Sequence, residues 1–398
     1  MLPVLSSRVL SRRAALAAAA AAALAGRAQA QVQAAKPRSP LAITVVDVAG
    51  NLALTQKAFE NYRRAKPDMV SRFTFTKAPA PELPAKLRAQ QAANRVDIDL
   101  VLTGTDALAA GIDQKIWEHL LPARAGALPD LKAILLEPAL RMQGLAQGQG
   151  VIISYYPSGP LLEYMPDQIK SPPTTAEELL AFTKSKPNRF MYARPANSGP
   201  GRTFIMGLPY ILGDKDPKDP IGGWDKTWAF LGELDAGIEY YPTGTGATMK
   251  ELGEGSRDMI VSTTGWDINP RVLGIVPKEA KVATLKGFHW VIDAHFAAMP
   301  KGLDPERQAV LLDLIAFLLT PAQQAFTYDE GYFYPGPAVK DVTLAMAPAE
   351  SQAAIKEFGR PEYEQLIASA PTELPLEADK MVQAFRRWDE QIGAKKTK

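Results

Sequence analysis

Short apolar runs alternate with helix-like segments near the start of the chain, and this alternation limits the folds open to it. The strand-like and helix-like segments follow one another at residues 42–48, 52–65, 69–76, 82–94, 99–103 and from 106 onward. Strands that alternate with helices in this way form a largely parallel sheet with helices on both faces. The pattern predicts an α/β fold that opens with a doubly wound sheet.

A second series of the same kind occupies residues 151–285. Its strand-like runs lie at residues 151–155, 189–193, 238–241 and 259–263, with helix-like segments between them. A break rich in Gly and Gln at residues 144–150 separates the two series and suits a crossover. We therefore predict two doubly wound lobes, the first beginning with residues 41–150 and the second formed by residues 151–287.

The last strand-like run, residues 285–300, is rich in aromatic and β-branched residues. Side chains alternate faces along a strand, so His289, Asp293 and His295 are expected on one face and Trp290 on the other. We interpret this strand as the return of the chain to the first lobe, with its polar face along the cleft between the lobes. The alternative is a half-buried strand with a solvated face. In the return-strand interpretation, residues 288–398 hold the return to lobe 1, the second part of that lobe and the C-terminal helices.

Residues 1–30 have the form of an export signal. A basic start with Arg12 and Arg13 leads into an Ala/Leu run too short to span a bilayer, and then into a small-x-small cleavage site at residues 28–30. The Arg pair is similar to a twin-arginine signal, although general secretion stays open. Residues 31–40 are predicted to be a flexible lead. The chain has no Cys, and Arg27 stands where a lipidated Cys would be, so we expect an exported protein without a lipid anchor or disulfides.

Polar, Gly-rich turns follow several predicted strands. They are the first candidates for a binding site, because ligands of open α/β sheets lie beyond the carboxyl ends of the strands. The candidates at these turns are Gly50, Asn51, Thr103, Gly104, Thr105, Asn197, Ser198, Gly199 and Gly201. The turn at residues 197–201 could present backbone N–H groups to a bound oxygen. A plain strand-to-helix turn is the alternative.

Two Trp–Asp pairs are further candidates. Trp266 and Asp267 follow a predicted strand, and Trp290 and Asp293 lie in the return strand. A Trp face beside a carboxylate is a suitable receptor for an ammonium group. The alternative is that each Trp is a core residue and that Asp267 caps the next helix.

Enzyme motifs are sparse. The chain has three His, no Gly-x-Ser-x-Gly elbow, no dinucleotide fingerprint after the first strand and no phosphate-binding loop. Asp293 and His295 could form part of a metal site. His289 is too far along the strand to join them, since alternate residues are ~6.5–7 Å apart. We therefore expect a non-enzymatic protein without a metal or cofactor, with a metal-dependent hydrolase as the alternative.

The whole mature chain resembles the bacterial extracellular solute-binding proteins of family 1, the periplasmic receptors of ABC importers. The matching parts are Gly50 and Asn51, residues 99–105, residues 192–204 with Ser198 and Gly199, residues 241–267, and the run from His295 and Phe296 through residues 318–324 to Gly331 and Tyr332. The resemblance implies the type II periplasmic-binding-protein fold, two lobes joined by crossover strands that close on a solute. It also implies a monomer whose partners are a small-molecule solute and an ABC permease and ATPase.

The solute follows less directly from the resemblance. Polyamine receptors of the family pair a Trp and an Asp shortly before an Ile-Pro. Here Trp290 and Asp293 lie further from Pro300 and differ from that pair in their own spacing, so the match to a polyamine receptor is incomplete. Ferric receptors use adjacent tyrosines, but the Tyr pairs at 155–156 and 240–241 lie in predicted strands. We expect a small polar solute, amine-bearing or zwitterionic, with an iron-type receptor as an alternative. The formal charge of +2, without basic runs in the body of the chain, gives no indication of nucleic-acid binding.

Overall fold

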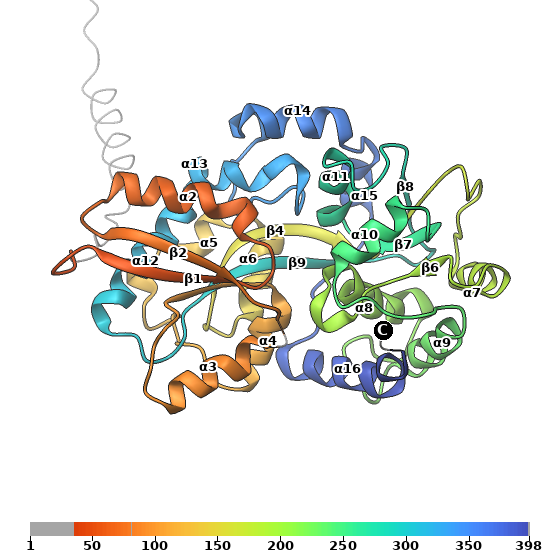
Figure 1. The fold of residues 1–398 in the computed structure, drawn as a ribbon, viewed down its shortest axis with the longest axis horizontal. Coiled ribbons are helices and arrows are strands. Elements are labelled where there is room, and N and C mark those ends of the chain that lie inside the picture. Colours follow the sequence, from red (N-terminus) through yellow and green to blue (C-terminus); the bar gives the residue numbers. More distant parts are fainter. Residues whose placement is uncertain (1–35, 81, 397–398) are drawn as a thin grey trace, which may run out of the picture.

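The computed structural model of the protein describes residues 36–80 and 82–396. Two sheets, each covered by helices, lie side by side (Figure 1). One has six strands in the order β10-β9-β3-β1-β2, with β4 also paired to β9, and the other has four strands in the order β6-β7-β5-β8. The predicted export signal at residues 1–30 lies outside the described residues.

The first sheet begins with the predicted alternation. Its opening elements are β1 (Leu41–Asp47), α2 (Leu52–Ala65), β2 (Val70–Lys77), α3 (Leu83–Ala92), β3 (Leu100–Thr103) and α4 (Thr105–Asp113). β1 pairs in parallel with both β2 and β3, as the pattern predicts. Val45 and Val46 are buried in β1, and α2 packs Phe59 and Tyr62 into the same core, because its apolar residues recur at helical spacing.

Two long strands connect the sheets. β4 (Val151–Gly159) and β9 (Trp290–Ala298) pair antiparallel, and every residue of both is buried. β4 continues through Pro160 into β5 of the second sheet, while β9 pairs with β3 of the first. The predicted return strand at residues 285–300 is therefore present as β9. Its polar face is buried rather than solvated.

The second sheet differs in part from its prediction. Its strands are β5 (Leu161–Tyr164), β6 (Phe190–Met191), β7 (Met259–Ser262) and β8 (Lys281–Ala283). Its helices are α7 (Ala176–Ser185), α8 (Gly199–Leu212), α9 (Asp225–Asp235), α10 (Thr245–Gly253) and α11 (Thr264–Val272), with a 3-10 turn, η2 (Pro195–Asn197), before α8. β6 and β7 are parallel, whereas β5 is antiparallel to β7 and β8.

The strand predicted at residues 238–241 is wrong. Tyr241 instead packs its ring against Tyr192 and Trp388, and its hydroxyl donates a hydrogen bond to Asp235. A run of four residues, here with buried Ile238 and Tyr241 on either side of exposed Glu239, suits a loop as well as a strand, so periodicity could not decide between them.

The C-terminal part is helical, as predicted. Its elements are α12 (Pro305–Leu318), α13 (Pro321–Gln324), η3 (Ala325–Gly331), η4 (Leu344–Met346), α14 (Ala349–Phe358), α15 (Glu362–Ser369), the short strand β10 (Thr372–Glu373), α16 (Ala378–Gln391) and η5 (Gly393–Lys395). Asp304 is the N-cap of α12, and its side chain accepts a hydrogen bond from the Arg307 N–H. Three short helical pieces before β4 complete the fold: η1 (Ala125–Ala127), α5 (Leu131–Ile134) and α6 (Glu137–Leu145).

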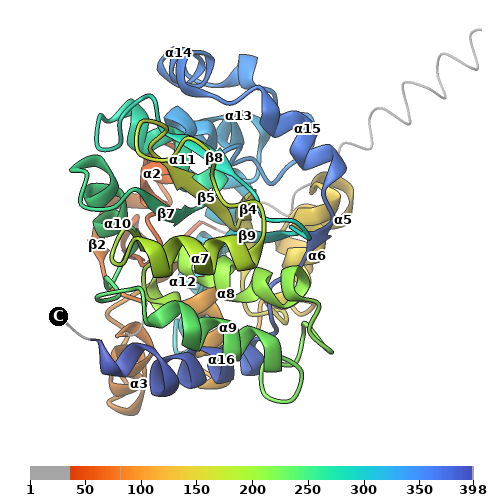
Figure 2. The same cartoon turned by 90° about the vertical axis from the view of Figure 1, so that its right-hand side faces the viewer.

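The last long helix, α16, belongs to the core of the second sheet. Met381, Ala384 and Trp388 are buried in the same cluster as Tyr192. Figure 2 shows α16 running beside α9. α16 also packs against α4 of the first sheet, and Ala109 of α4 joins this cluster. The chain thus returns to the second sheet after completing the first.

Among the described residues, no single helix meets the length and hydropathy of a membrane span. One bent pair, α12 with residues 321–331, meets them by length and composition only.

Glu163 of β5 is a fully buried acid. Burial, and next to it the nearby Asp267 carboxylate, raise the pKa of its carboxyl from an ordinary value of 4.5 to about 8. Between these two pH values the unfolded chain loses a proton that the folded protein keeps. The stability that Glu163 contributes is therefore complete below about pH 4.5 and is lost as the pH rises through about 8.

We predict that Glu163→Gln removes this dependence, because the amide does not titrate. From pH 5 to pH 8 the free energy of unfolding of the wild type should fall relative to that of the variant, as measured by urea denaturation. Glu279→Gln, which changes an exposed acid, should follow the wild type. Parallel pH profiles for the wild type and Glu163→Gln would contradict the prediction.

Candidate binding site

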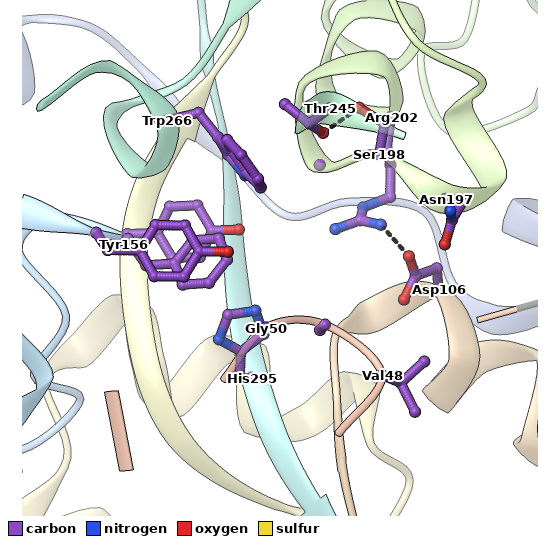
Figure 3. Close-up of a pocket in the computed structure, with 14 residues that line it drawn as sticks. Val48, Gly50, Asp106, Tyr156, Asn197, Ser198, Arg202, Thr245, Trp266 and His295 are labelled. Carbon is purple, nitrogen blue, oxygen red and sulfur yellow. Dashed lines mark hydrogen bonds and ion pairs between the residues drawn. The ribbon is translucent and has the colours of Figure 1, made fainter. Parts of the chain in front are cut away.

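A cavity of about 270 Å³ lies between the two sheets. The first sheet and its loops contribute Val48, Ala49, Gly50, Asp106, Tyr156, His295, Tyr332 and Phe333. The second contributes Asn197, Ser198, Gly199, Arg202, Thr245 and Trp266. Figure 3 shows an aromatic group on one side and the Arg202–Asp106 pair on the other. The cavity is therefore built jointly by segments far apart in the sequence.

Strand ends and helix starts supply most of these residues. Asp106, Gly199, Thr245 and Trp266 stand in the first turns of α4, α8, α10 and α11. The N-terminus of a helix carries a partial positive charge and free N–H groups, so the places where these helices begin suit ligand oxygens. At α8, Ser198 is the N-cap, and its hydroxyl oxygen accepts from the Gly201 N–H at 3.1 Å.

The loop after β1 is shaped by Asp47. Its buried carboxylate accepts hydrogen bonds from the backbone N–H groups of Ala49, Asn51 and Leu52, at 3.0–3.2 Å. Gly50 has a φ of +77°, and a Cβ there would lie 2.5 Å from the Tyr332 hydroxyl. Only Gly fits this close approach, so the loop and the tyrosine define one wall together.

Arg202 forms the charged floor of the cavity. Its guanidinium pairs with Asp106 at 2.8 Å and also with Asp293, which accepts further hydrogen bonds from Tyr156 at 2.9 Å and Thr105 at 3.2 Å. Burial lowers the pKa of the guanidinium, but Asp293 and Asp106 outweigh burial and raise it above its ordinary value. Two carboxylates face one guanidinium, so the cluster has one negative charge in excess.

His295 presents a neutral ring to the cavity. Burial lowers its pKa to about 4, although Asp293 opposes the shift. Its Nδ1 lies 3.2 Å from the amide nitrogen of Asn51 and 3.1 Å from the hydroxyl of Ser154. An amide nitrogen is only a donor, so Nδ1 accepts and the ring proton is on Nε2.

Four aromatic side chains form the wall opposite Arg202. The rings of Trp266 and Tyr332 pack edge to face with their centroids 5.4 Å apart, and the ring centroids of Tyr332 and Phe333 are 4.0 Å apart. Phe333 in turn lies 5.1 Å from Tyr156. Burial raises the pKa of Tyr156 and of Tyr332, so both phenols are neutral. A neutral aromatic wall beside an excess negative charge suits a cationic group.

The predicted site residues fall into three groups. Those that line the cavity are Gly50, Asn197, Ser198, Gly199, Trp266 and His295. Those that lie behind its walls are Asn51, Thr103, Gly104, Thr105, Gly201 and Asp293. Asn51, Thr105, Gly201 and Asp293 make the contacts described above, and the Thr103 hydroxyl donates to the carbonyl of Gly104. Asp267 and Trp290 lie elsewhere.

The two remaining residues correct the prediction of two Trp–Asp pairs. Trp290 is buried in the core against Phe288, and its indole N–H donates to the carbonyl of Leu366 at 3.1 Å. Positions 290 and 293 point to opposite faces of β9, so this pair cannot meet one ligand. Asp267 is buried, and its carboxylate is occupied by Arg271, Arg360 and Tyr363.

Eight lining residues were missed by sequence reasoning: Val48, Ala49, Asp106, Tyr156, Arg202, Thr245, Tyr332 and Phe333. Some left a signal. Arg202 is the only charged residue within the apolar helix α8, and Asp106 and Thr245 stand where predicted helices begin. Ala49 stands at the same strand end as the predicted Gly50, whereas Val48 had no signal, because an apolar residue at a strand end looks like core.

The metal-based alternatives gain no support from this geometry. Asp293 is engaged by Arg202, Tyr156 and Thr105, and Nδ1 of His295 is engaged by Asn51. Within the part of the chain that the structure describes, no three His, Asp or Glu residues gather so that they could hold a metal ion. Of the tyrosine pairs, only Tyr156 reaches the cavity.

A model of the family described as bacterial extracellular solute-binding protein matches residues 57–357, well over half of the chain. The chain belongs to this family. The resemblance predicted from the sequence is confirmed at this level of description. No curated protein matches the chain significantly.

Several solved periplasmic binding proteins have a similar fold. A periplasmic thiamin binding protein is 17% identical, with a TM-score of 0.63 over 92% of this chain and 100% of that chain. AfuA from Actinobacillus pleuropneumoniae, with fructose-6-phosphate bound, is 13% identical, with a TM-score of 0.61 over 89% and 99%. Iron-bound HitA from Pseudomonas aeruginosa is 16% identical, with a TM-score of 0.56 over 87% and 99%. At these identities the likeness shows the fold, which is the predicted type II periplasmic-binding-protein fold.

We predict that Asp267→Asn destabilises the fold by about 3–5 kcal/mol, because it leaves the buried guanidinium of Arg271 and the largely buried guanidinium of Arg360 without their carboxylate. Urea denaturation measures this loss. Trp266→Ala, at the neighbouring position but in the cavity wall, should cost less. A loss below about 1 kcal/mol for Asp267→Asn would show that the network is not needed for folding.

Proposed function

We propose that the protein is the periplasmic receptor of an ABC importer, which captures a small solute by lobe closure and delivers it to a membrane permease and its ATPase. The observation that carries this proposal is the cavity between the two sheets, to which both sides contribute polar groups and aromatic rings. Such a cavity encloses a solute when two lobes close about connecting strands. Here β4 and β9 are the connecting strands.

The proposed lobes follow the two sheets. Lobe 1 takes residues 41–150 and much of residues 288–398, and lobe 2 takes residues 151–287. Two elements are exceptions. β4 lies in the range of lobe 2 but pairs with β9 in the first sheet, and α16, within residues 288–398, packs its buried residues into the core of lobe 2. We place the receptor in the periplasm as a monomer, in keeping with the export signal expected at residues 1–30 and with the family.

The proposed solute is amine-bearing or zwitterionic. The excess negative charge of Asp106 and Asp293 over Arg202 favours a cation, and Trp266 and Tyr332 offer aromatic surface to it. The starts of α8 and α10, with Ser198 and Thr245 hydrogen bonded at 2.7 Å, suit an anionic or carbonyl oxygen. A zwitterion would use both sides. The similar proteins of known structure bind thiamin, a sugar phosphate or iron, so the shared fold does not choose among solutes.

A ligand panel tests the proposal. Putrescine, choline, glycine betaine, arginine, succinate, inorganic phosphate and glucose would be compared by thermal shift and calorimetry. We predict that the cationic or zwitterionic members raise the melting temperature, and that X-ray scattering shows a compact form in their presence. Binding of the anions alone would overturn the solute chemistry. No binding and no compaction with a broad metabolite library would overturn the receptor function.

We also predict that Trp266→Ala weakens binding of whichever cationic ligand is found by about tenfold or more, because a cation–π contact in a desolvated site is worth up to ~2 kcal/mol. Calorimetry would compare it with Tyr210→Ala, which removes a ring that stacks on His289 outside the cavity. Tyr210→Ala should bind as the wild type does. Equal affinities for the wild type and Trp266→Ala would show that Trp266 of the aromatic wall does not contribute to ligand binding.

A further inference from the structure

A second hollow of about 590 Å³ also lies between the two sides of the molecule. From the first side it is lined by Pro79 and Glu82, which precede α3, and from the second by Ala196, Thr243, Phe385 and Trp388. We call this hollow the outer groove. Because it is formed by both lobes, it changes shape with any motion that opens the cavity.

Asn197 joins the outer groove to the cavity. It lines both, and its amide nitrogen donates to the backbone carbonyl of Thr243 at 2.8 Å. In Figure 3 it stands on the side of the cavity away from Trp266 and Tyr156. A ligand whose cationic end lies against the aromatic wall and whose other end extends past Asn197 would reach the outer groove.

The walls of the outer groove are mostly apolar. Phe385 is partly exposed, while Trp388 is buried beneath it and its indole N–H is already hydrogen bonded to the Tyr192 hydroxyl. Arg194 also lines the groove, but it pairs with Asp389 at 2.6 Å and lies over the Trp388 ring. Its charge is therefore already matched.

The rim holds the remaining charges of the outer groove. Arg386 and Glu82 are both exposed, and they carry opposite signs. Since these charges offset one another, the groove offers no net field to a charged group. An uncharged apolar chain gains most from it, through burial against Phe385 and Pro79.

We propose that the solute is elongated, with a cationic head in the cavity and an apolar tail in the outer groove. This inference rests on the proposed receptor function and deepens it. The cavity of about 270 Å³ holds the head, and the groove provides room for several methylene groups or a ring. Phe385 then determines specificity for the tail, although it does not touch the head.

A homologous series tests the inference directly. Tetramethylammonium and its single-chain homologues butyl-, hexyl- and octyltrimethylammonium would be titrated by calorimetry, each below its critical micelle concentration. We expect tetramethylammonium to bind weakly and affinity to rise with chain length by up to about fourfold per methylene, which corresponds to ~0.8 kcal/mol per buried CH₂. The rise should level off once the tail extends beyond the groove.

Two variants locate the tail. Phe385→Ser removes apolar wall, and Ala196→Trp fills the groove without removing a core contact. Both should bind tetramethylammonium as the wild type does and should lose most of the gain with chain length. Leu273→Ser, which alters an exposed apolar side chain elsewhere, should keep the gain. Unchanged thermal unfolding would show that the variants are folded.

The outcomes separate the two proposals. If neither tetramethylammonium nor any homologue binds, the cationic head chemistry fails and the inference fails with it. If all homologues bind with equal affinity, the outer groove takes no tail, while the receptor function stands. If the gain persists in both Phe385→Ser and Ala196→Trp, the tail lies elsewhere and the inference is overturned.

Discussion

The arrangement of the two lobes depends on one buried cation, Arg202. An ion removed from water costs several kcal/mol unless charges and hydrogen bonds replace its hydration. Arg202 belongs to α8, but its partners Asp106 and Asp293 belong to α4 and β9 of the other side. The guanidinium is therefore compensated only when the two sides lie together. The same contact sets the floor of the cavity and its excess negative charge, so the lobe closure and the cationic solute that we propose would share one cause.

A second buried network holds the opposite wall. Asp267 of α11 is bound by Arg271 of the same helix and by Arg360 and Tyr363 of the C-terminal part. This network anchors the helix that carries Trp266 into the cavity. The two neighbouring residues thus differ in role: Trp266 faces the cavity, and Asp267 faces the core. The difference explains why an acidic residue next to a site residue need not contact a ligand.

The opening elements of the first sheet could be predicted closely, because β1 and β3 are continuous apolar runs, β2 alternates apolar and polar residues, and α2 has apolar residues at helical spacing. The short strand β10 was not predicted, since Thr372 and Glu373 carry no strand pattern. The second sheet could be predicted only in part. β5, a run of only four residues after Pro160, was not predicted, and the run at residues 238–241, which includes the exposed Glu239, is a loop. The spacing of apolar residues along the sequence indicates which residues are buried, but burial alone does not distinguish a short strand from a packed loop.

The sequence by itself determined the α/β class, the two series of strands and helices, the family, and the turns at which a ligand could be held. Those properties are local, since periodicity and turn chemistry act over a few residues. Only the tertiary structure decided which turn residues share a cavity. It brought Arg202, Tyr156 and Tyr332 into the site and left Trp290 in the core, because packing over distant segments determines which side chains face one another. The pairing of β4 with β9 and the burial of Arg202 are the physical reasons for that choice.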